Sequence, residues 1–227
     1  MIRLRFCSLF LLALSVPILA HAHKLDIANF GHGADNEGVP RDWQLKEKAG
    51  RADFALVQSD GVHALQLRSA NSSFSFQRRV QADLKEYPLL SWKWKVTQLP
   101  QGGDFRRSKT DDEAAQLFVA FSRTRAIVYV WDTSAPQGLM ENATAPPFMS
   151  IKAVVVRSGP AELGKWINET RNVYEDYKRL YGDAGRPPVV SGMRLQINSQ
   201  HTGTSAACAF ADVTFRSLSP APPQGSG

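Results

Sequence analysis

The fold is determined by the stretch LFVAFSRTRAIVYVW, residues 117–131. It contains two almost continuously apolar runs, Leu117 to Phe121 and Ala126 to Trp131, joined by the polar link 122–125. Two such runs with a link of hairpin length predict neighbouring antiparallel strands. Because neither run alternates with polar residues, we expect both strands to be covered on both faces, as in the centre of a sheet.

Alternation of apolar and polar residues predicts further strands on both sides of this hairpin. In residues 90–96 every second side chain is apolar and the others are serine or lysine, which is typical of a half-buried strand. About ten short strands, without regular strand–helix alternation, predict an all-β fold: an antiparallel β-sandwich or jelly roll. The same period of two occurs in residues 63–67, 74–80, 151–155 and 193–197.

One segment has helical spacing instead. From Leu163 to Tyr181, apolar and aromatic residues recur at intervals of three and four, and Gly182 follows. This spacing predicts one amphipathic α-helix, with its aromatic side docked on the sandwich and its charged side in water.

The first 22 residues have the layout of a secretory signal peptide. Arg3 and Arg5 precede an apolar stretch, and small residues surround a cleavage site after Ala22. A retained anchor is the alternative, although the run is short for a membrane-spanning helix. We expect residues 23–216 to form a single β-sandwich domain, residues 217–227 a disordered tail, and the protein to be a periplasmic or secreted monomer.

Charge and cysteine content restrict the partners. The formal charge of +6 falls to +4 without the signal segment, which carries two arginines and no acidic residue. Nucleic-acid binding normally requires a concentrated basic face with interleaved aromatic residues. The densest basic clusters here are only 78–79 and 106–109, the second in a polar loop, so we expect no nucleic-acid partner. Because Cys7 lies in the signal segment, Cys208 has no internal disulfide partner, and its apolar surroundings predict a buried strand position.

Three blocks of the sequence together point to a family. They are DDEAAQLFVAF (111–121), AIVYVW (126–131) and WINETRNVYEDY (166–177), the last followed by Tyr181-Gly182. The chain resembles the bacterial family catalogued as domain of unknown function 3047, from about residue 25 to residue 215. This resemblance implies an exported β-sandwich, distantly similar to carbohydrate-binding, galactose-binding-like jelly rolls, with no established activity.

The sequence departs from the family pattern near its end. Where the pattern has Asp-x-Asp-Asn-Thr-Gly, this chain reads NSQHTG in residues 198–203, so both carboxylates are missing. Amides are poorer ligands than carboxylates for a hard cation, which puts any cation or catalytic role of this loop in doubt.

An acidic cluster precedes the central hairpin. Asp111 and Asp112, with Glu113 beside them, either bind Ca²⁺ at the rim of the jelly roll, or raise one another's pKa for general acid work, or form a solvated loop. We assign Asp111 and Asp112 as the predicted metal ligands; no cofactor is required beyond this possible Ca²⁺.

Other residues are candidates for ligand binding. Trp131 ends a strand and is followed by Asp132, which suits an exposed edge where an indole ring stacks on a sugar, although a core position is the alternative. Arg171 and Asp176 either complete a polar site beside the acidic loop or form a structural salt bridge. Asn198, in the altered loop, joins this set.

These features favour a non-catalytic binding module for carbohydrate or cell-envelope glycan, and we assign no catalytic residue. One alternative is a glycan-active hydrolase that uses Asp111, Asp112 or Asp176 as acid and base. The other is a periplasmic scaffold that binds a protein through loops 100–110 and 133–147. The sequence contains no Gly-x-Ser-x-Gly motif, phosphate-binding glycine loop or zinc-ligand spacing.

Overall fold

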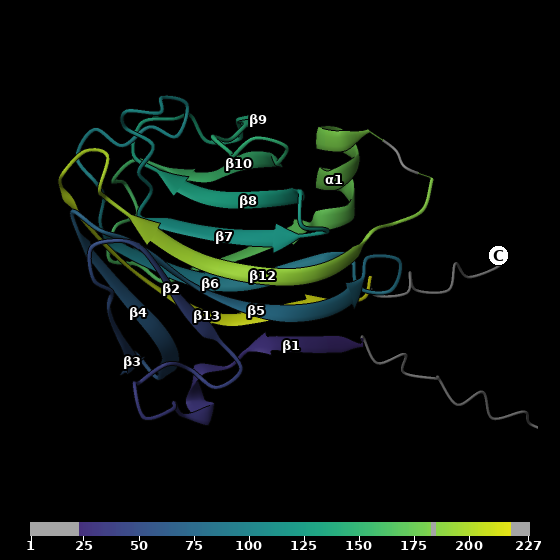
Figure 1. Ribbon diagram of the computed structural model, residues 1–227. Coiled ribbons are helices and arrows are strands. Elements are labelled where there is room, and N and C mark those ends of the chain that lie inside the picture. The colour runs from purple at the N-terminus through teal and green to yellow at the C-terminus, as the bar shows by residue number, and fades with distance from the viewer. Residues whose placement is uncertain (1–22, 183–184, 219–227) are drawn as a thin grey trace, which may run out of the picture.

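The computed structural model describes residues 23–182 and 185–218, which form two β-sheets packed face to face and one α-helix (Figure 1). The predicted signal peptide and residues 219–227 of the predicted tail lie outside the described residues. No helix in the described ranges has the length and apolarity needed to cross a membrane.

The first sheet has six strands and the second has seven, and both combine neighbours that are consecutive in the chain with neighbours that are far apart in it. In the six-stranded sheet the order is β11-β6-β13-β4-β3, with β1 also paired to β13; in the seven-stranded sheet it is β2-β5-β12-β7-β8-β10-β9. The six-stranded sheet contains β1 (Lys24–Ala28), β3 (Asp53–Ser59), β4 (Val62–Ala70), β6 (Leu89–Gln98), β11 (Ile167–Asn172) and β13 (Ser205–Arg216). The seven-stranded sheet contains β2 (Gln44–Ala49), β5 (Ser73–Asp83), β7 (Ala115–Ala120), β8 (Arg125–Asp132), β9 (Met140–Asn142), β10 (Ser150–Ser158) and β12 (Val189–Asn198).

The central hairpin is confirmed. β7 and β8 pair antiparallel, with Leu117 opposite Tyr129. Their inner side chains enter the core between the sheets, whereas Phe118, Val128 and Val130 form a second buried apolar cluster on the outer face. Both faces are therefore covered, as the continuous apolar runs predict.

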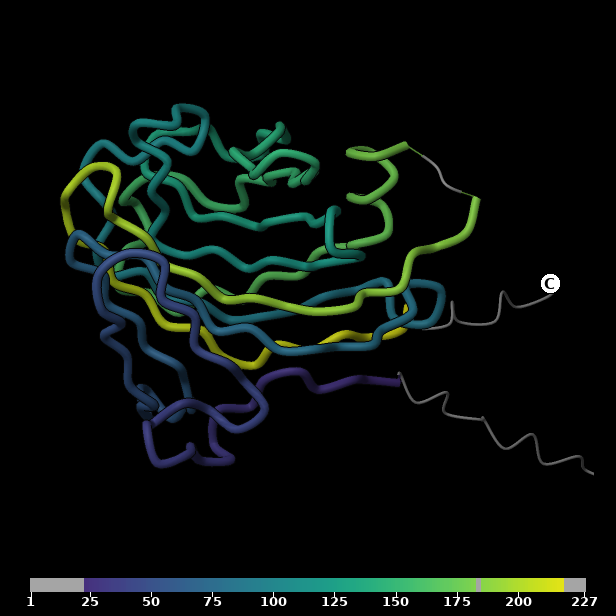
Figure 2. The backbone as a smooth tube through the Cα atoms, viewed as in Figure 1, coloured from purple at the N-terminus to yellow at the C-terminus, as the bar shows by residue number. Residues whose placement is uncertain are grey.

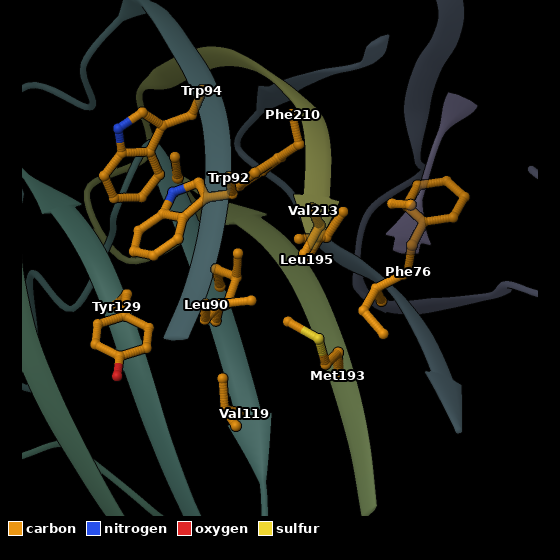
Figure 3. Close-up of a cluster of buried hydrophobic side chains, with 14 of the residues drawn as sticks. Phe76, Leu90, Trp92, Trp94, Val119, Tyr129, Met193, Leu195, Phe210 and Val213 are labelled. Carbon is orange, nitrogen blue, oxygen red and sulfur yellow. The ribbon is translucent and has the colours of Figure 1, made fainter. Parts of the chain in front are cut away.

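The core between the sheets is built around aromatic rings. Trp92 and Trp94 of β6 are fully buried, and their ring centroids lie 5.3 Å apart at an interplanar angle of 90°. Figure 3 shows Trp92 directed toward Tyr129 of the opposite sheet, at a centroid distance of 5.3 Å. Cys208 is buried in β13, as predicted, and burial raises the pKa of its thiol.

One strand pair departs from the predicted antiparallel pattern. β10 pairs with β8 in the parallel direction, so the seven-stranded sheet is mixed. The chain does not turn back directly after β8, because residues 133–149 intervene and contribute the short strand β9 at the edge. Figure 2 shows this segment as a folded loop beside β10. A parallel pair requires such a crossover connection.

The predicted helix is correct only in its second half. The helix α1 spans Val173–Tyr181, and Asn172 caps it by accepting a hydrogen bond from the backbone N–H of Glu175 at 3.1 Å. Residues 167–172 are instead the strand β11, paired with the edge of β6. The helical spacing of Leu163 to Thr170 was misleading, because pairing with β6 satisfies the backbone of this segment and orders its side chains in place of a helix.

The aromatic side of α1 docks on the sandwich, as predicted. The ring of Tyr177 packs on Phe121 with a centroid distance of 4.9 Å. The hydroxyl of Tyr181 lies 2.7 Å from the carbonyl oxygens of Ala126 in β8 and Ser150 in β10, and it donates a hydrogen bond to one of them. The helix thereby covers the ends of the central strands (Figure 1).

Candidate functional site

The outer face of the seven-stranded sheet is hollowed along its length. Two hollows, of about 870 Å³ and about 240 Å³, adjoin because Phe118, Met149, Ile151 and Arg194 line both. We refer to the two together as the groove. Its floor is β2, β5, β12, β7, β8 and β10, and residues 143–149 lie at its rim.

The polar floor of the groove follows from strand alternation. In β12 the apolar residues Met193, Leu195 and Ile197 face the core, so the intervening Arg194 and Gln196 face outward. The strand register then continues this outer face across the sheet in a single row. The row consists of Gln44, Gln77, Arg194, Phe118, Val128 and Ala153.

Arg194 lies at the junction of the two hollows. Its guanidinium carbon is 3.6 Å from the centroid of the Phe118 ring, so the cation covers the aromatic face. Its Nε atom is buried and has no hydrogen-bond partner among the described residues. Burial lowers the pKa of Arg194 to about 10, which leaves the group charged at neutral pH.

Two carboxyl groups form the acidic end of the groove. Glu113 is 3% exposed, and its pKa is raised well above the ordinary value, first by burial and then by the charge of Asp111. Burial also raises the pKa of Asp111, although the hydrogen bond with Glu113 opposes this shift. Glu113 Oε1 is buried and has no hydrogen-bond partner among the described residues, so the site favours the protonated form of Glu113.

Asn198 and Asp112 hold this end of the groove in place. Asn198 Nδ2 donates to the carbonyl oxygen of Asp111 at 2.6 Å, and its Oδ1 accepts from the backbone N–H of Glu113 at 3.0 Å. The carboxylate of Asp112 is fully buried and accepts from the backbone N–H groups of His201, at 3.2 Å, and Thr202, at 2.6 Å. Asp112 therefore fastens the 198–203 loop to the start of β7.

The predicted binding edge at Trp131 is wrong. Its side chain is 1% exposed and lies in the core against Trp94, with its Nε1 donating to the carbonyl of Gly159 at 3.1 Å. In β8 it has the same parity as Ile127 and Tyr129, which also face inward.

Asp132 does not face the groove. It is fully buried, and its carboxylate accepts backbone hydrogen bonds from Phe105, Ser134 and Ala135 at 3.0, 2.7 and 2.6 Å. These bonds use the carboxylate to order the loop that follows β8, and neither Trp131 nor Asp132 lines the two hollows.

Arg171 and Asp176 form an ion pair between β11 and α1. Arg171 Nε donates to Asp176 at 2.9 Å, and the hydroxyl of Tyr129 donates to the same carboxylate at 3.0 Å. Asp176 is 2% exposed and does not line the groove. The pair joins helix to sheet, which agrees with the structural salt bridge that the sequence predicts as one of two roles for these residues.

The predicted metal ligands are separated by their partners. Asp111 lines the smaller hollow, whereas Asp112 is directed into the 198–203 loop. Within residues 23–182 and 185–218, no three histidine, cysteine or acidic side chains are grouped to hold a metal ion. The Ca²⁺ site stays a prediction.

An exposed aromatic residue precedes Met149 at the rim. Phe148 is 97% exposed and has a φ of 68°, in the left-handed region that a bulky side chain rarely adopts. Exposure and backbone strain together are typical of functional loops, where the surrounding structure holds a residue in an unfavourable conformation.

Sequence reasoning missed Arg194, Gln196 and Phe118 as site residues. The alternation of residues 193–197 was the available signal, because an inward-facing Met193, Leu195 and Ile197 require an outward-facing arginine and glutamine. What could not be inferred locally is that residues 101–113 and 133–149 border this face and make it concave.

The fold and the groove define the class: a two-sheet β-sandwich of the jelly-roll kind with a hollowed outer face. The chain belongs to the family described as "Protein of unknown function (DUF3047)", which matches residues 41–214. No curated protein matches the chain.

Solved structures with a similar fold have low sequence identity. The family 11 carbohydrate-binding module of the cellulase Lic26A-Cel5E of Clostridium thermocellum is 10% identical, with a TM-score of 0.44, over 87% of this chain and 95% of that one. The xyloglucanase domain of NopAA from Sinorhizobium fredii, in complex with cellobiose, is 10% identical, with a TM-score of 0.48 and coverages of 78% and 93%. The endoglucanase cel12A from Rhodothermus marinus is 7% identical, with a TM-score of 0.45 and coverages of 86% and 100%.

Proposed function

We propose that this chain is an exported, non-catalytic binding module for a glycan, which lies along the groove. The observation that carries the proposal is the row of outward side chains across the sheet, from Gln44 and Gln77 through Arg194 to Phe118. Side-chain amides donate and accept at once, which suits sugar hydroxyls, and strands hold them in fixed positions. The larger hollow, of about 870 Å³, falls within the range of small-ligand sites.

Apolar groups complete the complementarity to a sugar. Phe118 and Met149 line both hollows, and Phe148 extends from the rim. Aromatic rings pack on the C–H faces of sugar rings while polar neighbours bind the hydroxyls.

The carboxyl groups favour binding over hydrolysis. A glycosidase needs two carboxyl groups roughly 5 to 10 Å apart across the cleft. Asp111 and Glu113 instead line the same small hollow, and burial favours the neutral form of Glu113. The carboxylate of Asp112 accepts hydrogen bonds from backbone N–H groups, and Asp176 pairs with Arg171.

Calorimetric titration and thermal shift of the purified chain test the proposal. The probes are cello-, xylo- and chito-oligosaccharides, uronic-acid oligosaccharides and peptidoglycan fragments. A bound glycan at 100 times its dissociation constant stabilises by about 2.7 kcal/mol, which raises the melting temperature by roughly 5 to 10 °C. A flat response to every probe would refute the proposal.

A pair of matched variants locates the site. Gln77→Ala removes an amide from the groove, and Gln58→Ala removes one from β3 of the other sheet, where Gln58 is exposed. Losing one hydrogen bond weakens binding roughly three- to tenfold, so Gln77→Ala should bind weakly and Gln58→Ala like the wild type. Equal affinities for all three proteins would place the ligand elsewhere.

A further inference from the structure

Arg194 carries a charge that its own protein does not neutralise. The guanidinium contacts the ring of Phe118, its Nε has no partner, and no ion pair among the described residues includes it. A partly buried cation without a counter-charge is costly, because burial removes water that nothing replaces.

Two other half-buried arginines of this chain are neutralised by carboxylates. Arg157 pairs with Glu169 at an N···O distance of 2.6 Å, and Arg171 pairs with Asp176 at 2.5 Å. Arg194 differs from both, and so does the half-buried Arg78, which also lines the larger hollow and whose Nε has no hydrogen-bond partner among the described residues.

The larger hollow as a whole is basic. Arg78, Arg79, Arg123, Arg125 and Arg194 line it, and Asp42 is its single acidic lining residue among those described. Arg78 and Arg125 are held by Ile27 O and by the hydroxyl of Tyr177, but these partners are neutral and leave both charges in place. The hollow therefore attracts a negatively charged group.

We propose that the ligand is an anionic glycan, one whose sugars carry carboxylate groups, and that Arg194 binds one of these carboxylates. This inference rests on the glycan-binding function proposed above and names its ligand class. The planar guanidinium suits a carboxylate, since its parallel N–H groups match the two oxygens. Phe118 lies against the guanidinium, and both residues line the two hollows where the ligand would bind.

The opposite end of the groove limits how densely the ligand is charged. Asp111 and Glu113 line the smaller hollow together with Arg194, and a second anion beside them would be repelled. The oxygens of these carboxyl groups suit sugar hydroxyls instead. A carboxylated sugar chain, which alternates charges with hydroxyls, fits this arrangement better than a nucleic acid, whose every unit carries a phosphate.

The experiment compares charged and neutral forms of the same sugar chain. The probes are oligogalacturonate, oligomannuronate and oligoglucuronate, each beside its methyl ester, together with a sulfated heparin oligosaccharide and single-stranded DNA. We expect at least one uronate to bind, and its methyl ester to bind roughly ten- to hundredfold more weakly, because a charged hydrogen-bonded pair is lost.

Charge variants assign the effect to Arg194. Arg194→Gln should lower the affinity for the uronate roughly ten- to hundredfold. Arg194→Lys should retain part of the affinity, because the charge remains although the planar guanidinium is lost. Arg179→Gln on α1, an exposed position outside the groove, removes the same charge and should bind like the wild type. Melting curves establish that each variant is folded; Arg194→Gln removes an unpaired charge and should not melt lower.

The outcomes separate this inference from the proposed function. If neutral oligosaccharides bind as tightly as uronates and Arg194→Gln changes nothing, the anionic ligand is refuted while glycan binding stands. If no glycan binds, both fail. Binding of heparin but of no uronate would refute the carboxylate as the recognised group and favour a sulfate. Binding of DNA alone would refute the proposal that the ligand is a glycan.

Discussion

Asp112→Ala tests how the acidic end of the groove is built. The carboxylate is fully buried and accepts hydrogen bonds from two backbone N–H groups, of His201 and Thr202, and from Nδ2 of Asn198. Substitution removes all three acceptor contacts and disconnects the 198–203 loop from the start of β7. We expect the folded state to persist with a displaced loop and a lower free energy of unfolding.

The magnitude follows from the number and kind of the lost contacts. A hydrogen bond to a charged acceptor contributes about 1.5 to 3 kcal/mol. The Nδ2 group of Asn198 keeps the carbonyl of Asp111, and the N–H groups of the partly exposed His201 and Thr202 regain water when the loop moves. The net loss is therefore about 3 kcal/mol, which lowers the melting temperature by roughly 6 to 12 °C.

Urea denaturation followed by tryptophan fluorescence measures this loss. The matched control is Asp26→Ala, whose carboxylate is 53% exposed and forms a surface ion pair with Lys24 at 3.0 Å. Surface pairs contribute less than about 1 kcal/mol, so the control should remain close to the wild type. A loss below about 1 kcal/mol for Asp112→Ala would show that its hydrogen bonds do not hold the loop.

Other substitutions test the core, the acid pair, the rim and the ion. Trp131→Ala should lower the free energy of unfolding by about 3 to 5 kcal/mol in urea denaturation, because it leaves a cavity in the core. A small loss of stability together with altered glycan binding would instead show that Trp131 is a surface binding residue. The raised pKa of Glu113 stabilises the fold below its ordinary pKa of 4.5, and this contribution is lost as the pH rises through the folded-state pKa. Glu113→Gln should therefore flatten the fall in stability with rising pH; identical pH profiles of the two proteins would refute the raised pKa of Glu113. Phe148→Asn should raise the free energy of unfolding by roughly 0.5 to 1 kcal/mol, since asparagine tolerates the left-handed backbone; a decrease would show that the exposed ring makes stabilising contacts. If Ca²⁺ binds at Asp111, the melting temperature is higher in Ca²⁺ than in EDTA and Asp111→Asn removes the difference, whereas equal values for the wild type rule the site out.

Several features could be predicted from the sequence because they depend on local patterns. The hairpin of residues 117–131, the buried Cys208 and the end of α1 at Tyr181 all follow from polarity and from glycine at position 182. Asp111 and Asn198 were also named, and both line the smaller hollow.

Other features could not be predicted, since local patterns there fit two structures equally well. Residues 167–172 have apolar spacing compatible with a helix, yet they form a strand because they pair with β6 at the edge of the sheet. Trp131 lies in a run without polar neighbours, so the sequence does not reveal which way its ring points. The buried carboxylates of Asp112 and Asp132 accept hydrogen bonds from Thr202 and Phe105, which are distant from them in the chain.

The sequence by itself determined which side chains share a face, because a strand repeats every two residues whatever surrounds it. The tertiary structure alone decided what each face meets. β12 pairs with β5 on one side and β7 on the other, and this long-range pairing places Arg194 beside Phe118 and away from any carboxylate partner. Such contacts depend on packing between segments far apart in the chain, which no local pattern encodes.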